Sequence, residues 1–169
     1  MTFPKAFPAN ATVAKVTRTI NRPITEVFNY IVPVSIPHIF PRQGEAPGVV
    51  ATTITSDWGT PGQQRICTFD DDTTMHETLL TVEQDKSFSY KCEDFSNEGL
   101  AGLIQRIDGN WNFVDHGNGT TSLEWNYILI PKNDDVLPIL VDELVPVYRD
   151  RLETAVTILK SDLEIRKLG

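Results

Sequence analysis

The sequence predicts an α+β domain in which a seven-stranded antiparallel sheet is covered by one long helix. Three observations support this class. Short segments separated by turn residues follow one another from about Val49 to Pro131. A further strand and a short helix precede them, and apolar residues recur at three- and four-residue steps from Val141 to Leu163. The closing helix is the only element large enough to cover the apolar face of the sheet.

The first elements are a strand and a short helix. Residues 12–20 mix β-branched and charged residues in near alternation, which is typical of a half-buried strand. Pro23 is tolerated in the first turn of a helix and Glu26 favours its positive end, so a short helix with an apolar face follows. Three prolines then prevent a long regular continuation, and we expect 33–48 to be irregular with one helical turn around His38–Phe40.

Six more strands are expected in the segment that follows, because no helical period competes there and turn residues mark each boundary. They are predicted at 49–56, 63–69, 76–82, 87–94, 105–114 and 121–130. In the final helix, Pro146 interrupts the first turns. We expect either a kink there or a restart with Pro146 in the first turn, and a continuous helix from about 147 to 166.

Size and charge limit the classes of function. The 169 residues, 40% of them apolar, suit a single domain over 1–169 with its core at about 12–166. Acidic residues number 23 against 15 basic ones, which gives a formal net charge of −8. This charge argues against nucleic acid and against an anionic membrane surface as partners, since both would repel the chain.

Several features favour a reducing compartment, and we expect a cytoplasmic protein. Cys67 and Cys92 are too few for a disulfide framework. Their predicted strands have one strand between them, which puts them about 9–10 Å apart, too far for a disulfide. Met1–Lys5 lack the apolar stretch of a signal peptide. No segment approaches the roughly 18 apolar residues of a membrane span.

No cofactor or metal ion is expected. The sequence lacks a Ser-His-Asp order, a phosphate-binding glycine loop and a dinucleotide fingerprint. His76 and Glu77 form half of a metal motif, but no second His or Cys follows at helical spacing. The acidic run Asp70–Asp72 lacks the ligand spacing of an EF-hand and fits a solvated hairpin loop.

Several short matches, taken in their order and spacing, resemble the helix-grip fold of the START, Bet v 1 and polyketide cyclase superfamily, also called SRPBCC. The resemblance extends from Thr12 to Glu164. It is carried by 23–28, Gly62 with Arg65, Glu77 with Tyr90, 109–111 with Gly119, 123–127, and 159–164.

The resemblance implies a curved sheet wrapped around the last helix, with a hydrophobic cavity between them. It also implies an entrance near the loops after the third and fifth strands, and a gate in the loop at Asp70–Asp72, whose charge would disfavour anionic ligands. Members of the superfamily include lipid carriers, hormone receptors and aromatase/cyclases, so the fold does not determine an activity.

Strand alternation and the family pattern select the side chains expected to face the cavity. Arg65 shares a strand face with Cys67 and Phe69. The family pattern places Glu77 and Leu79 inward, although 76–82 has an equally apolar opposite face. The expected ligand-binding residues are Tyr30, Phe69, Leu79, Tyr90, Trp111, Trp125, Tyr127 and Tyr148.

Arg65 and Glu77 are expected to be buried on neighbouring strands, where each charge would be costly alone, so we expect a mutual ion pair. Two functional interpretations stay open beside this structural one. The pair could orient a ligand. Alternatively, Arg65 could hold a carbonyl or enolate oxygen while Glu77 or His76 removes a proton, as an aldol-type cyclisation requires.

The leading hypothesis is a protein that binds a hydrophobic or aromatic small molecule in an internal cavity, acting on it as a polyketide cyclase/aromatase-like enzyme or leaving it unchanged. The first alternative is a non-catalytic lipid or small-ligand carrier. The second is a protein-interaction module whose cavity has collapsed. The sequence leaves the oligomeric state and the identity of the ligand open.

Overall fold

The computed structural model describes residues 7–54 and 57–165, which form one antiparallel sheet with a long helix against it. The strand order is β1-β7-β6-β5-β4-β3-β2, so β2 to β7 form a meander and β1 lies at the edge beside β7. The predicted α+β class with seven antiparallel strands and a long closing helix is confirmed. The strands are β1 (Val13–Ile20), β2 (Val49–Thr52), β3 (Gln64–Phe69), β4 (Thr74–Glu83), β5 (Ser87–Glu93), β6 (Ile104–Asp115) and β7 (Thr121–Pro131).

Short helices connect the strands where the sequence predicts turns or helical segments. α1 (Ile24–Ile31) and α2 (Ile36–Ile39) carry the chain from β1 to β2, the two edges of the sheet, and α3 (Glu98–Ala101) joins β5 to β6. Pro23 directly precedes α1, where its missing N–H costs no helical hydrogen bond. α2 begins two residues before the turn expected at His38, because Pro37 is accepted in its first turn.

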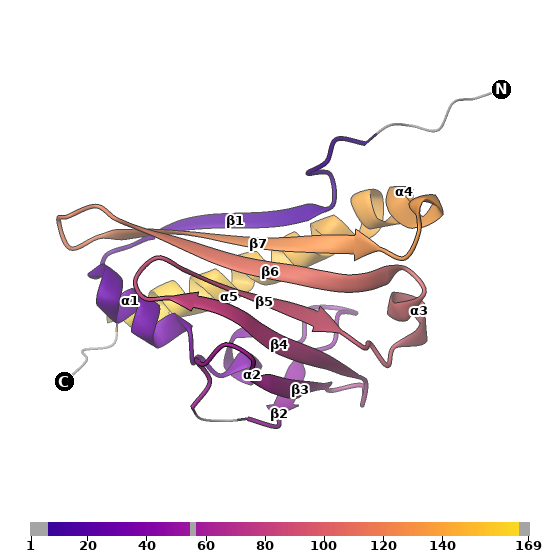
Figure 1. Cartoon of the computed structure of the whole chain (residues 1–169), viewed down its shortest axis with the longest axis horizontal. Helices are drawn as coiled ribbons and strands as arrows, with labels where there is room; N and C mark the ends of the chain where they lie inside the picture. The colour runs from indigo at the N-terminus through magenta and orange to yellow at the C-terminus, as the bar shows by residue number, and fades with distance from the viewer. Residues whose placement is uncertain (1–6, 55–56, 166–169) are drawn as a thin grey trace.

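The C-terminal segment is helical from Asp134 to Ile165, and the sheet curves around its longest part, α5 (Figure 1). Before α5 (Val145–Ile165) come η1 (Asp134–Val136), α4 (Leu137–Ile139) and η2 (Leu140–Leu144). The predicted apolar stripe of α5 is buried, as shown by Val145, Leu152, Ala155, Val156, Leu159 and Leu163. Among the described residues, no helix combines the length and apolarity needed to cross a membrane.

Pro146 lies in the first turn of α5, which is the second of the two arrangements expected from the sequence. Its ring would clash with the carbonyl four residues earlier in a regular α-helix. The preceding turn, η2, is instead π-helical, and the N–H of Val145 donates to the carbonyl of Leu140, five residues earlier. This wider turn lets the helical path continue past the proline.

β4 contains a bulge between Leu79 and Thr81. Before the bulge, Glu77 and Leu79 are buried on the inner face, as the family pattern implied. After the bulge, Val82 packs against the core, although it lies three residues after Leu79. The bulge therefore explains why both faces of 76–82 look apolar in the sequence.

β2 differs most from its predicted range of 49–56, because it ends at Thr52. The Thr52 hydroxyl donates to the carbonyl of Ile54, and this local bond competes with regular strand pairing. The other strands end within two residues of their predicted limits. Residues 55–56 of the expected strand and residue 166 of the expected helix lie outside the described residues.

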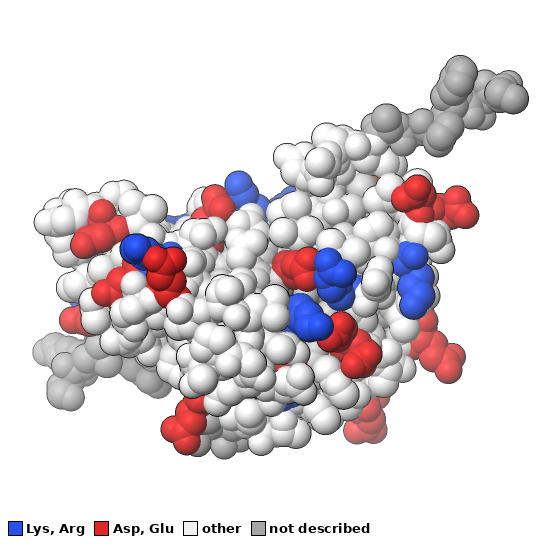
Figure 2. Space-filling model, viewed as in Figure 1, with Lys and Arg blue, Asp and Glu red and all other residues white. Residues whose placement is uncertain are grey.

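The outer surface carries charges of both signs. Figure 2 shows acidic and basic side chains beside one another on the face it presents. Two pairs illustrate the pattern on neighbouring strands: Lys91 binds Glu93 at 2.7 Å and Arg106 binds Asp108 at 2.9 Å. Such partly exposed pairs contribute little to stability because water screens them.

Candidate ligand cavity

A cavity of about 330 Å³ lies between the inner face of the sheet and the start of α5. Its lining comes from β2 to β7, from the α1–α2 segment, and from residues of the loops after β3 and β5. Most of the lining side chains are apolar or aromatic. Among the described lining residues, the charged ones are Arg65, Glu77 and Arg151. Small-molecule sites usually combine such an apolar lining with a few polar groups, in volumes of roughly 300–1,000 Å³.

The sheet side of the cavity is an aromatic wall formed by Phe88, Tyr90, Trp111, Trp125 and Tyr127. Strand register makes Trp111 the direct neighbour of both Phe88 and Trp125. The rings of Trp111 and Trp125 stack with centroids 4.2 Å apart, and those of Phe88 and Trp111 stack at 5.6 Å. Contacts of this kind add to the burial of the rings and hold the wall in one arrangement.

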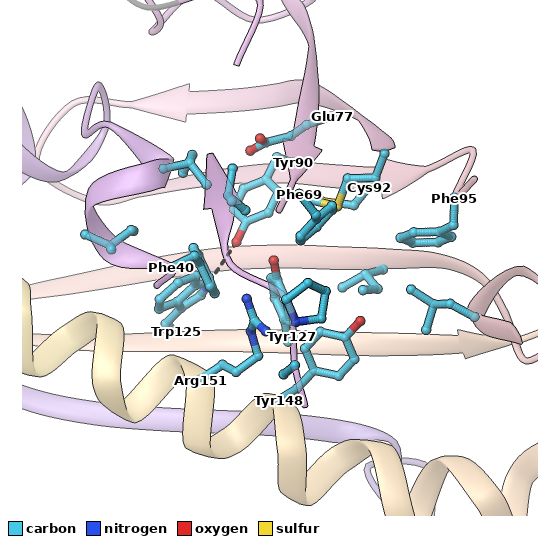
Figure 3. A pocket seen from close by; sticks show the side chains of 18 of the residues that line it. Phe40, Phe69, Glu77, Tyr90, Cys92, Phe95, Trp125, Tyr127, Tyr148 and Arg151 are labelled. Atoms are coloured by element: carbon cyan, nitrogen blue, oxygen red, sulfur yellow. Dashed lines mark hydrogen bonds between the residues drawn. The ribbon is translucent and has the colours of Figure 1, made fainter. Parts of the chain in front are cut away.

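Gly109 makes room for Tyr90 in this wall. It pairs with Tyr90 on β5 and with Tyr127 on β7, and a Cβ atom at this position would lie 2.2 Å from Cζ of Tyr90. The Tyr90 ring can therefore lie flat over the strand, where its hydroxyl accepts a hydrogen bond of 2.8 Å from Nε1 of Trp125 (Figure 3).

Arg65 and Glu77 form the expected ion pair across β3 and β4. They are direct neighbours in the strand register, and Nε and Nη2 of Arg65 donate to the two Glu77 oxygens at 2.8 and 3.2 Å. The guanidinium carbon also lies 3.9 Å from the centroid of the Trp58 ring. Because Arg65 binds both carboxylate oxygens, Glu77 is not a free base in this structure.

His76 does not reach the cavity, which corrects its assignment as an alternative proton acceptor. Its side chain is 49% exposed on the opposite face of β4, where Nδ1 lies 3.3 Å from a carboxylate oxygen of Asp94. Strand alternation is the cause, since Glu77 on the same strand points inward and adjacent residues point to opposite faces.

Tyr30 and Leu79 also lie outside the cavity lining, in contrast to the prediction. The Tyr30 hydroxyl donates to Oδ2 of Asp162 on α5 at 2.6 Å, and Nε2 of His38 lies 2.6 Å from the same oxygen. Leu79 faces inward but is completely covered by other core side chains. The other expected ligand-binding residues line the cavity: Phe69, Tyr90, Trp111, Trp125, Tyr127 and Tyr148.

Arg151 lines the cavity from α5 and was missed in the sequence. Figure 3 shows its side chain extending from the helix toward the side chains of the sheet. It is only 6% exposed, and its guanidinium carbon lies 5.5 Å from the centroid of the Phe40 ring. The sequence does contain a signal that Arg151 faces inward. Arg151 lies three residues after Tyr148 and four before Ala155, so it falls within the apolar stripe of the helix.

The hydroxyls and thiols around the cavity are protonated at neutral pH. Burial raises the pKa of Tyr148 to about 12 and raises the pKa values of Tyr90 and Tyr127 well above their usual range. Burial likewise raises the pKa of Cys67 to about 12 and raises that of Cys92. Both cysteines are free, as predicted, and they are thiols rather than nucleophilic thiolates.

The acidic loop is partly neutralised. Nε and Nη2 of Arg42 donate to the two oxygens of Asp70 at 2.9 and 2.6 Å, and the hydrogen bond from Arg42 lowers the pKa of Asp70. The Asp71 carboxylate accepts from the hydroxyl and N–H of Thr73 within the turn. In residues 7–54 and 57–165, no group of three His, Cys, Asp or Glu side chains could hold a metal ion.

Comparison with known proteins identifies the architecture. No protein-family model and no curated protein matches the sequence. Three solved structures are similar: XoxI from Bacillus cereus (TM-score 0.64, 13% identity, 89% of this chain and 94% of that one) and Ara h 8.0201 (0.64, 13%, 91% and 98%). The third is DynU16, from the dynemicin biosynthetic locus (0.61, 16%, 90% of this chain but 47% of that one). The chain therefore has the Bet v 1-like helix-grip fold that the sequence resemblance implied.

Proposed function

We propose that the protein binds a hydrophobic or aromatic small molecule in the cavity between the sheet and α5. The main support for this proposal is the cavity of about 330 Å³ that the side chains leave open between the aromatic wall and α5. An apolar molecule that fills a cavity of this size gains favourable contacts with the largely apolar lining. The interaction module with a collapsed cavity is not retained, because the cavity is open.

Binding without chemistry is the form of this function that the polar groups favour. An aldol-type cyclisation needs a base beside the substrate and a donor for the developing oxyanion. Donors are present as protonated tyrosines, but Glu77 is the only carboxylate among the described lining residues and both its oxygens bind Arg65. His76 faces away from the cavity.

A thermal-shift screen with apolar and aromatic compounds tests the proposal. A ligand present at 100 times its Kd adds about 2.7 kcal/mol to the free energy of unfolding. In a domain of this size, that corresponds to a rise in Tm on the order of 5–10 °C. The proposal is wrong if no compound in the screen raises Tm.

A matched pair of variants locates the binding site. Val147 lines the cavity from α5 and is 43% exposed, so Val147→Trp would project a large ring across the opening without overpacking the core. Val114 on β6 is 56% exposed and does not line the cavity. We expect Val147→Trp to abolish the thermal shift and Val114→Trp to preserve it. Equal shifts in both variants would indicate binding elsewhere.

Catalysis of a cyclisation or aromatisation is the second candidate. Its support is the set of protonated tyrosines facing the cavity, together with the similarity in fold to a protein of the dynemicin biosynthetic locus. Glu77→Gln separates the two functions, because it removes the carboxylate and keeps the size of the side chain. Loss of turnover with unchanged ligand affinity would favour the enzyme, and loss of affinity alone would favour the binding protein.

A further inference from the structure

Arg151 is a buried cation without a partner of its own. No carboxylate among the described residues forms an ion pair with it, and no described group accepts a hydrogen bond from it. Its guanidinium carbon lies 5.5 Å from the centroid of the Phe40 ring. Burial lowers the pKa of Arg151, but a guanidinium remains protonated at neutral pH. The charge is thus held in a position with little solvent, where an unpaired ion is unfavourable.

Residues 7–54 and 57–165 offer no anion that could neutralise Arg151. Glu77 is the acidic residue among the described lining residues, and Arg65 binds both of its oxygens. Asp70 is close enough to act electrostatically on Arg151, but Arg42 already binds both Asp70 oxygens. The lining described here therefore contains one uncompensated positive charge, in a protein whose formal net charge is −8.

A hydrogen-bond donor lies beside this charge. Tyr148 is one helical turn before Arg151 on α5, and Tyr127 contacts Tyr148 from β7 with ring centroids 5.6 Å apart. Figure 3 shows Tyr148 and Arg151 extending from α5, with Tyr127 opposite them on the sheet. Burial raises the pKa of Tyr148 to about 12, so its hydroxyl is protonated and can donate to an anion that Arg151 attracts.

We infer that the cavity takes an amphipathic monoanion, with an aromatic or apolar body and a carboxylate that pairs with Arg151. The inference rests on the proposed function and adds the charge and orientation of the ligand. The apolar body lies against the aromatic wall of β5 to β7, and the carboxylate faces α5. A planar guanidinium suits this role because it can bind both oxygens of a carboxylate.

Two naphthalene compounds test the inference: naphthalene-2-carboxylate and naphthalene-2-methanol, which share a carbon skeleton and differ in charge. Titration calorimetry on the wild-type protein should give at least ten-fold tighter binding of the carboxylate. Arg151→Met keeps an unbranched side chain about as long as the aliphatic stem of arginine and removes the charge, so it should abolish this preference and leave the affinity for the alcohol within about two-fold. Arg151→Lys should retain part of the preference.

Arg149→Met is the matched control, because Arg149 is exposed, lies two residues away and does not line the cavity. It should leave the preference for the carboxylate unchanged. If Arg151→Met does not fold, Arg151→Gln provides the same comparison with a shorter, uncharged polar side chain.

The outcomes separate this inference from the proposed function. If the wild-type protein binds both compounds equally, or if Arg151→Met and Arg151→Gln keep the preference, the inference is wrong and the cavity remains a site for apolar ligands. If the screen finds no apolar ligand and neither naphthalene compound binds, the proposed function fails and the inference fails with it.

Discussion

The two walls of the cavity hold a buried arginine in opposite ways. On the sheet wall, Arg65 is 5% exposed, binds both oxygens of Glu77 and stacks on Trp58. On the helix wall, Arg151 is 6% exposed and forms neither an ion pair nor a hydrogen bond with a described residue. Burial is the same, so the difference lies in the partners. Arg65 belongs to the architecture of the wall, whereas Arg151 is available to a ligand.

Breaking the pair on the sheet wall should have the largest effect. Arg65→Met leaves the Glu77 carboxylate buried and uncompensated, which we expect to lower the free energy of unfolding by about 3–5 kcal/mol. The double variant Arg65→Met/Glu77→Leu removes both charges and should recover most of this loss. Urea denaturation measures both. A double variant no more stable than the single one would show that the pairing is not what stabilises this wall.

Disturbing the aromatic wall should have a smaller effect. Gly109→Ala places a Cβ atom 2.2 Å from Tyr90 Cζ, so the ring must move and its hydrogen bond with Trp125 is lost. We expect a cost of about 1–3 kcal/mol, typical of overpacking. The tryptophan signal in near-UV circular dichroism should change as well.

Gly59→Ala is the matched control for this wall, because the nearest atom to its Cβ is Cγ1 of Val32 at 3.9 Å. It should change neither the stability nor the spectrum noticeably. A similar loss of stability in both variants would show that the cost does not come from the contact with Tyr90, because the restriction of the unfolded chain by alanine stabilises the folded state.

On the helix wall we expect a substitution of the arginine to raise the free energy of unfolding rather than lower it. Arg151→Met removes an unpaired buried charge, so the ligand-free protein should become more stable, by about 1–2 kcal/mol. Urea denaturation in the absence of ligand measures this change. Destabilisation of similar size would mean that Arg151 belongs to the architecture, as Arg65 does, and would remove the distinction between the two walls.

The exposed pair of Arg42 and Asp70 provides the smallest expected effect. The hydrogen bond from Arg42 lowers the pKa of Asp70 below its ordinary value of 3.8. The folded protein therefore gains stability above that pH, and this gain disappears as the pH falls through the lowered pKa. Tm of wild-type protein and Asp70→Asn, measured from pH 7 downward, should differ slightly at pH 7 and converge as the pH falls through the lowered pKa of Asp70. Divergence at low pH would contradict the assigned cause.

The sequence predicts the sheet wall well because strand alternation assigns each side chain to a face. Alternation puts Arg65 on the inner face of its strand, and the family pattern puts Glu77 on the inner face of the next, so their pairing follows from the cost of burying either charge alone. Alternation cannot distinguish a side chain that lines the cavity from one that is covered by the core, and Leu79 was therefore predicted as a lining residue. It also fails at a bulge, such as the one after Leu79, because an extra residue reverses the pattern.

The helix wall is harder to predict. Helical periodicity is read from apolar residues alone, so it does not identify a charged residue that lies on the same buried face. Arg151 occupies such a position beside Leu152. Tyr30 was misassigned for a related reason, since the apolar face of α1 does not indicate which part of α5 it meets. That contact, from Tyr30 to Asp162, joins residues far apart in the sequence and depends on tertiary packing.

The most direct test of the central claim is a crystal structure of the protein with naphthalene-2-carboxylate. The account predicts that the naphthalene ring lies between the aromatic wall and α5, with the carboxylate about 3 Å from the Arg151 guanidinium. A ring bound outside the cavity, or a carboxylate directed away from Arg151 toward the sheet, would contradict it.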